Sequence, residues 1–153
     1  MSLQWFIAFV HLLALGIGLG AVWFRGRALL GQLDEPGIRR VLHADTWWGV
    51  AALLWVASGL VRVFAGTDKV SAYYFDNWLF WTKMTLFFVI LLHEIRPMLV
   101  LIRWRRALGA GRMPDTTLAR RMARISFIET GIVVVMVALA TGMARGWGTL
   151  GGG

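Results

Sequence analysis

The chain has 153 residues, of which 58% are hydrophobic and only 16% are charged, and its mean hydropathy is +0.66. This composition excludes an ordinary soluble domain, because a core of this size could not bury so much apolar surface, and it indicates one membrane domain. The absence of cysteine excludes disulfides, thiolate metal sites and thiol redox chemistry. The net charge of +8 suits anionic lipid headgroups beside apolar segments better than nucleic acid, so we expect no nucleic-acid partner.

Four apolar stretches, 3–24, 46–65, 78–102 and 125–144, follow one another along the chain. Each is close to the ~20 residues that cross a ~30 Å hydrocarbon core. We expect the first to be retained, because it lacks the basic leading region and small-residue cleavage site of a signal sequence. The sequence therefore predicts an all-α fold, a four-helix transmembrane bundle in a single domain 1–153, with helices at about 3–30, 44–65, 77–106 and 118–146.

Basic residues flank these stretches unevenly. One side of the predicted bundle holds Arg62, Lys69 and Arg145. The other side is formed by the link between the first and second stretches and the link between the third and fourth. It holds Arg25, Arg27, Arg39, Arg40, Arg96, Arg103, Arg105, Arg106, Arg112, Arg120, Arg121 and Arg124. By the positive-inside rule these two links are expected in the cytoplasm and both termini outside, an N-out/C-out arrangement. We expect a multi-pass protein of the bacterial inner membrane.

Ionisable residues inside the apolar stretches are the strongest functional signal: His11, Lys83, His93, Glu94 and Glu129. Charge within a bilayer is costly, so each of these residues needs a partner or a function. At ~1.5 Å per helical residue, His11 lies about 12 Å and Lys83 about 7 to 8 Å below the outer boundary. The other three fall toward the inner side. The sequence therefore predicts two polar layers.

These residues also have structural interpretations. His11 is either a ligand or a packed side chain inside the bundle. Glu129 is either a proton acceptor near the cytoplasmic face or one half of an ion pair with Arg25 or Arg124. Lys83 either has a functional role inside the bundle or extends its amine to the outer lipid headgroups. His93 is either a ligand or part of the inner interfacial network.

The first helix carries a pattern that suits a b-type haem. His11, Gly18 and Arg25 are seven residues apart, which places them on one helix face. The His11 imidazole suits the iron, Gly18 leaves a gap for the flat macrocycle, and Arg25 suits a propionate group. We therefore predict haem b with His11 as the metal ligand. His93 lies about 10 Å from His11 in depth, which disfavours binding of one iron by both histidines. His11 with Lys83 nearby, or His11 with the other side of the iron open, fits the depths better.

Four segments resemble a known family: HLLALGIGLGAVWFRGRAL, ADTWWGVAALLWVASGL, AYYFDNWLFWTKMTLFFVILLHEIRPM and ARRMARISFIETGIVVVMVALATGMARG. Over essentially its whole length the chain is similar to domain-of-unknown-function family 2214, predicted bacterial inner-membrane proteins. No function comes with that family label.

More distantly, the chain resembles the copper-resistance-D-like group of four-helix proteins, which includes the HemJ-type protoporphyrinogen oxidase, a haem b protein. The pattern of that group matches His11, Trp23, Arg25, Lys83, His93, Arg124 and Glu129. The resemblance implies a haem b site and an oxidoreductase of HemJ-like type. The chain departs from the oxidase at AVWFRGR and FIETG, where the oxidase has FYLPR-like and NEIP-like segments.

Three interpretations of the function remain. The first is a haem b protein that oxidises a small hydrophobic substrate, a porphyrinogen or a quinol, with Glu129 or His93 taking protons. The second is a cofactor-free scaffold or transporter component, in which a homo-oligomer joined through Gly16, Gly18 and Gly20 would supply the path. Copper handling is the third, although no methionine repeat supports it. The candidate cofactor-binding residues are His11, Arg25, Lys83, His93 and Glu129.

Overall fold

The computed structural model describes residues 3–65 and 71–149. In chain order the helices are α1 (Leu3–Leu29), α2 (Glu35–Phe64), the short α3 (Ser71–Phe75), α4 (Trp78–Gly109) and α5 (Ala119–Ala144). No strand occurs within the described ranges, where β-type pairing is limited to an isolated bridge between Asn77 and Thr149. Four of these helices, α1, α2, α4 and α5, are long and apolar enough to cross a membrane. The predicted all-α, four-helix fold is confirmed.

The structured helices continue beyond the apolar runs, most clearly at the start of α2. This helix begins at Glu35, well before the expected 44, because Asp34 caps it. The Asp34 side chain accepts a hydrogen bond from the backbone N–H of Gly37 at 2.9 Å, and Pro36 occupies the first turn. Hydropathy marks where a helix enters lipid rather than where it ends. Lys69, which we counted on the outer side, lies outside the described residues.

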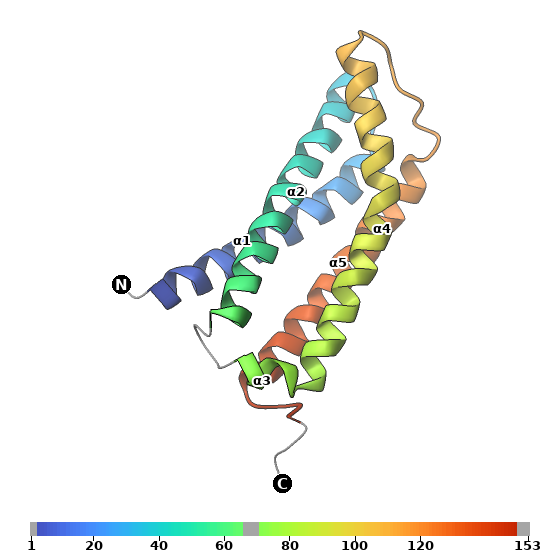
Figure 1. Ribbon diagram of the computed structural model, residues 1–153. Helices are drawn as coiled ribbons and strands as arrows, with labels where there is room; N and C mark the ends of the chain where they lie inside the picture. Colours follow the sequence, from blue (N-terminus) through green and yellow to red (C-terminus); the bar gives the residue numbers. More distant parts are fainter. Residues whose placement is uncertain (1–2, 66–70, 150–153) are drawn as a thin grey trace.

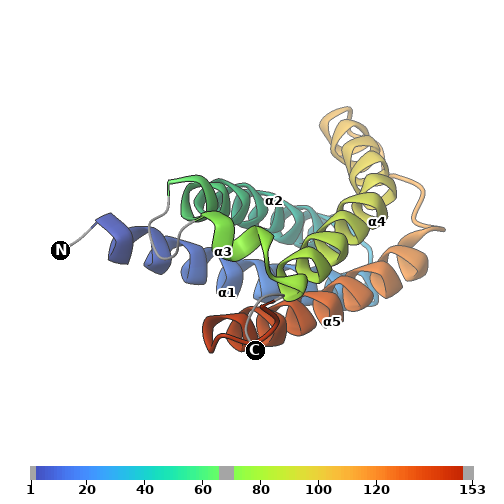
Figure 2. The ribbon, with the colours of Figure 1, turned by 60° about the horizontal axis from the view of Figure 1, so that its bottom comes forward.

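The four long helices are held together at one end of the bundle and diverge toward the other (Figure 1). α1 packs along α2, and α5 packs against both α1 and α4. The connections 30–34 and 110–118 lie at the end where α2 and α4 converge. At the opposite end α3 lies between the end of α2 and the start of α4 (Figure 2). In that half of the bundle the ribbons of α2 and α4 lie apart (Figure 1).

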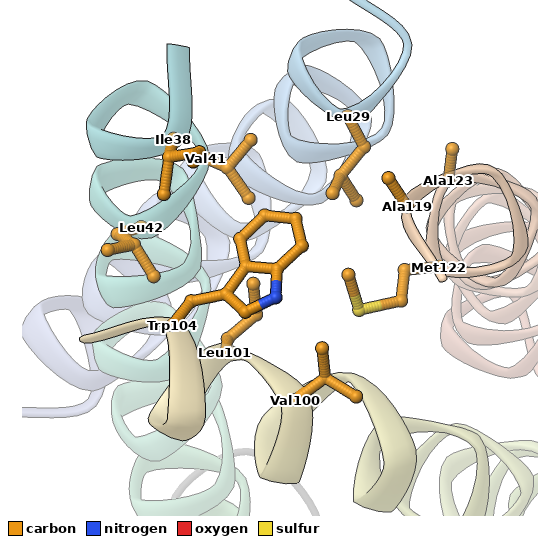
Figure 3. Close-up of a cluster of buried hydrophobic side chains, with 10 residues drawn as sticks. All are labelled: Leu29, Ile38, Val41, Leu42, Val100, Leu101, Trp104, Ala119, Met122 and Ala123. Carbon is orange, nitrogen blue, oxygen red and sulfur yellow. The ribbon is translucent and has the colours of Figure 1, made fainter. Parts of the chain in front are cut away.

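A cluster of ten buried apolar residues joins all four long helices at the convergent end (Figure 3). At its centre lies Trp104 of α4, which is 2% exposed and donates a hydrogen bond from Nε1 to the carbonyl of Asp115 at 3.0 Å. The other members are Leu29, Ile38, Val41, Leu42, Val100, Leu101, Ala119, Met122 and Ala123. We call this set the Trp104 cluster. It fixes the helices at this end, so their divergence is confined to the other.

The outer surface of the bundle is apolar. Large hydrophobic side chains point outward, among them Leu53 (74% exposed), Phe64 (69%) and Leu92 (69%). Such an extensive exposed apolar surface is unfavourable in water and suits contact with lipid chains. The molecule is therefore built to lie in a bilayer, while the N-out/C-out orientation stays a prediction.

Candidate functional site

A buried arginine gathers the charges of the convergent half. The Arg25 side chain is fully buried, and its Nε donates to Oγ of Ser126 at 3.0 Å. Its Nη1 donates to Oδ1 of Asp45 at 3.0 Å and to Oε1 of Glu94 at 2.5 Å. Its Nη2 donates to Oε2 of Glu94 at 2.8 Å and to Oε2 of Glu129 at 2.9 Å. All five N–H donors of the guanidinium are thereby used.

Arg105 links this group of charges to the surface. Its Nη2 lies 3.0 Å from Oδ2 of Asp45 and 2.9 Å from the carbonyl of Leu42, and its side chain is 42% exposed. Each of the four long helices contributes to the group. We call it the Arg25 cluster, and its members are Arg25, Asp45, Glu94, Arg105, Ser126 and Glu129. It forms because α2 and α4 converge there, and because buried charges require partners.

Glu129 is the most deeply buried carboxyl of the cluster. The ion pair that we considered for it forms with Arg25, whereas Arg124 is exposed on the outside of α5. Within the described part of the chain, Oε1 of Glu129 is buried and has no hydrogen-bond partner. This carboxyl therefore has one oxygen that the cluster does not use.

His11 lies in the other half of the bundle and has both ring nitrogens engaged. Its Nε2 accepts a hydrogen bond from Nε1 of Trp55 at 2.9 Å, and its Nδ1 lies 2.9 Å from Oγ of Ser58. The Ser58 hydroxyl donates its own proton to the carbonyl of Leu54 at 2.7 Å, so it accepts from His11. These contacts assign a neutral imidazole with the proton on Nδ1.

A pocket of about 310 Å³ opens beside His11, between α2 and α4. Lys83 of α4 lines the same pocket, and its Nζ lies 5.8 Å from the ring centroid of Phe80. The remaining wall is mostly apolar and includes Trp55, Phe64, Phe75, Trp81 and Phe87. We call this the α2–α4 pocket. Two residues distant in sequence, His11 and Lys83, thus share one site.

The candidate residues from the sequence therefore fall into two groups and one outlier. Arg25 and Glu129 belong to the Arg25 cluster, and His11 and Lys83 belong to the α2–α4 pocket. His93 belongs to neither, because it is exposed on α4 and its Nδ1 bonds to the carbonyl of Val89 one turn earlier, at 2.8 Å. Among the described residues, no group of three His, Asp or Glu side chains is arranged to hold a metal ion.

Sequence reasoning missed five partners: Asp45, Ser58, Trp55, Arg105 and Ser126. Asp45 and Arg105 flank apolar stretches in the sequence, where charge is expected and carries little signal. Ser58 and Trp55 are common residue types in membrane helices, and nothing in their spacing connects them to His11. One usable signal existed for Asp45, since it is the last acidic residue before the apolar run of α2.

Fold and site together define a four-helix membrane protein with a buried arginine–carboxylate cluster and a separate pocket lined by histidine and lysine. Residues 3–148 match the family described as predicted membrane protein (DUF2214), and the chain belongs to that family. No curated protein matches the chain, and no solved structure does either. The family agrees with the membrane-spanning fold, and its description assigns no function. The resemblance to the copper-resistance-D-like group stays a prediction.

Proposed function

We propose that this protein binds haem b in the α2–α4 pocket, where His11 would hold the iron, and that it serves a redox role in the bacterial inner membrane. The observation that carries this proposal is the presence of His11 and Lys83 in one apolar, aromatic-lined pocket. When bound, haem would supply one-electron chemistry. The residue that holds the iron and the polarity of the pocket would set its reduction potential.

The hydrogen bonds of His11 suit a metal ligand. A ligating histidine usually donates its other ring N–H to a fixed acceptor, which holds the ring and the tautomer. The Nδ1–H of His11 is held in this way by Ser58. The Nε2 lone pair accepts from Trp55, so Nε2 would be the atom of His11 that holds the iron, in place of this hydrogen bond. The volume of about 310 Å³ is smaller than a haem, so α2 and α4 would have to move apart in this half of the bundle to admit it.

Arg25 does not suit the role of a propionate partner. It is fully buried, and all of its N–H donors already bond to the carboxylates and Ser126. Glu129 belongs to the same cluster, and His93 is exposed elsewhere on α4. The proposed haem site therefore uses His11 and Lys83 from the five candidates.

The proposed substrate is a small hydrophobic molecule of the porphyrinogen or quinol class. The apolar lining of the pocket suits a molecule that reaches it from the membrane. The distant resemblance to the HemJ-type oxidase supports the same class. The chain itself would bind and orient this molecule and keep water out. A homo-oligomer is also a proposal, for which Gly16 and Gly20 offer support, since no other side chain lies within 4 Å of a Cβ placed at either one.

A cofactor-free scaffold or transporter component is the second candidate. The observation that favours it is the complete pairing of Arg25, which is what a structural ion-pair network requires. Copper handling gains no comparable support: among the described residues no group of three or more His, Cys, Asp or Glu side chains could hold a metal ion.

Visible spectra of the protein in mild detergent, oxidised and dithionite-reduced, test the haem proposal. We expect a Soret band in the wild type and its loss in His11→Ala. His93→Ala is the matched control and should keep the band, because His93 lies outside the pocket. Lys83→Met should move the band if the amine binds the iron. A wild type that stays colourless after haem addition, or a band that survives His11→Ala, would overturn the proposal in favour of the scaffold or transporter.

A further inference from the structure

The Arg25 cluster has more acidic than basic groups. Asp45, Glu94 and Glu129 supply three carboxyls, whereas Arg25 and Arg105 supply two guanidinium groups. If every carboxyl were ionised, one negative charge would be left in excess inside the bundle. An uncompensated buried charge costs several kcal/mol, so a bound proton that removes it is favourable.

The hydrogen bonds indicate which carboxyl takes that proton. Both oxygens of Glu94 accept from Arg25, and the two oxygens of Asp45 accept from Arg25 and Arg105. Glu129 accepts through Oε2 alone, and its buried Oε1 has no partner among the described residues. An ionised carboxylate with one bare, buried oxygen is costlier than a neutral carboxylic acid in the same place. Glu129 is therefore the carboxyl that is neutral.

A route for this proton leads from Glu129 toward the convergent end of the bundle. Glu94 and Glu129 both accept from Nη2 of Arg25, so their carboxyls are neighbours, and the Glu94 side chain is 19% exposed. Asp45 is 18% exposed, and Arg105 beside it is 42% exposed. The cluster thus grades from a fully buried carboxyl to partly exposed ones, which allows exchange with water at the end that carries the connections 30–34 and 110–118.

We infer that the Arg25 cluster is a proton-binding site, which holds one exchangeable proton on the Glu129 carboxyl and exchanges it with water through Glu94. The charged groups that face this carboxyl are Arg25 from α1, Asp45 from α2 and Glu94 from α4, with Arg105 behind Asp45. Met136, two turns further along α5 and about 10 Å away, lines the α2–α4 pocket. The site is thus placed to supply or receive protons near the pocket, and it does not depend on haem.

Infrared spectroscopy of the full chain tests this inference. In a maltoside detergent, which has no carbonyl of its own, the wild type should show the carbonyl stretch of a buried carboxylic acid. The band should shift in D₂O, because the proton exchanges. Glu129→Gln should abolish the band, whereas Glu35→Gln should keep it, since Glu35 is an exposed carboxylate paired with Arg39.

Thermal unfolding of Glu129→Gln provides a second measurement, and its outcome tests the inference even if the variant is unstable. The glutamine in Glu129→Gln has the shape and charge of the protonated acid, so its thermal unfolding temperature should stay close to that of the wild type. A large loss of stability would mean that Glu129 is ionised and would overturn the inference. A band that is absent from the wild type, or that survives Glu129→Gln and disappears in Glu94→Gln, would overturn it too. All spectra are taken on protein without haem, so failure of the haem proposal leaves this result intact.

Discussion

At the scale of single residues, Arg25 determines how charge is tolerated inside this bundle. A buried cation normally costs more in lost hydration than one partner returns. Arg25 meets this cost with five hydrogen bonds to four side chains that come from the three other long helices. Its planar fork matches the Glu94 carboxylate at both oxygens, which a lysine could not do.

Removal of this cation should be severe. Arg25→Ala leaves the carboxyls of the cluster without their common partner, so we expect a loss of about 3–5 kcal/mol in the free energy of unfolding. Circular dichroism during unfolding in detergent measures the effect. Arg27→Ala is the control, because Arg27 is exposed. Its guanidinium carbon lies 5.9 Å from the centroid of the Trp23 ring, a contact worth about 0.5–1 kcal/mol. Equal losses in the two variants would contradict the central role of Arg25.

At the scale of helices, α1 owes its close contact with α2 to one glycine. A Cβ at Gly18 would lie 3.3 Å from Cβ of Ala51 and 3.3 Å from the Trp48 ring. Gly16 and Gly20 lie two residues before and after Gly18 on the same helix. Among the described residues, a Cβ placed at either one would have no neighbour within 4 Å apart from the adjoining part of α1. The small residues that the sequence presents as one run therefore serve two different faces.

This difference predicts opposite tolerance to a large side chain. Gly18→Leu forces α1 and α2 apart and should lower the free energy of unfolding by about 1–3 kcal/mol. Gly20→Leu should leave the packing of α1 against α2 unchanged, because the new side chain meets only the open side of α1. Thermal unfolding of both variants in the same detergent makes the comparison. A strong effect at Gly20 together with a loss of self-association would instead place a second copy on that face.

At the scale of the whole molecule, the two ends of the bundle differ in both packing and charge. The convergent end carries the Trp104 cluster, the Arg25 cluster and most of the arginines, whereas the divergent end carries the α2–α4 pocket. From the positive-inside rule we expect the convergent end to face the cytoplasm. The proton site would then exchange with cytoplasmic water, and the pocket would open toward the outer leaflet.

Single cysteines test this orientation without background, because the natural chain has none. Arg112→Cys lies in the exposed connection 110–118, and Asp76→Cys lies at the exposed start of α4 on the opposite end. In spheroplasts a membrane-impermeant maleimide should label Asp76→Cys and spare Arg112→Cys until the cells are lysed. The reverse pattern would invert the orientation and assign the proton site to the outer aqueous phase.

The sequence by itself determined the four spans, because hydropathy and helix length suffice for these. It offered Arg25 and Arg124 as possible partners of Glu129, and the structure pairs Glu129 with Arg25. Only the tertiary structure decided the partners. It pairs Arg25 with Asp45 and Glu94, directs His93 outward and brings Lys83 to the pocket of His11. The physical reason is that helix rotation and crossing depend on side-chain packing around Trp104 and Gly18, and in lipid an apolar sequence is nearly uniform around each helix.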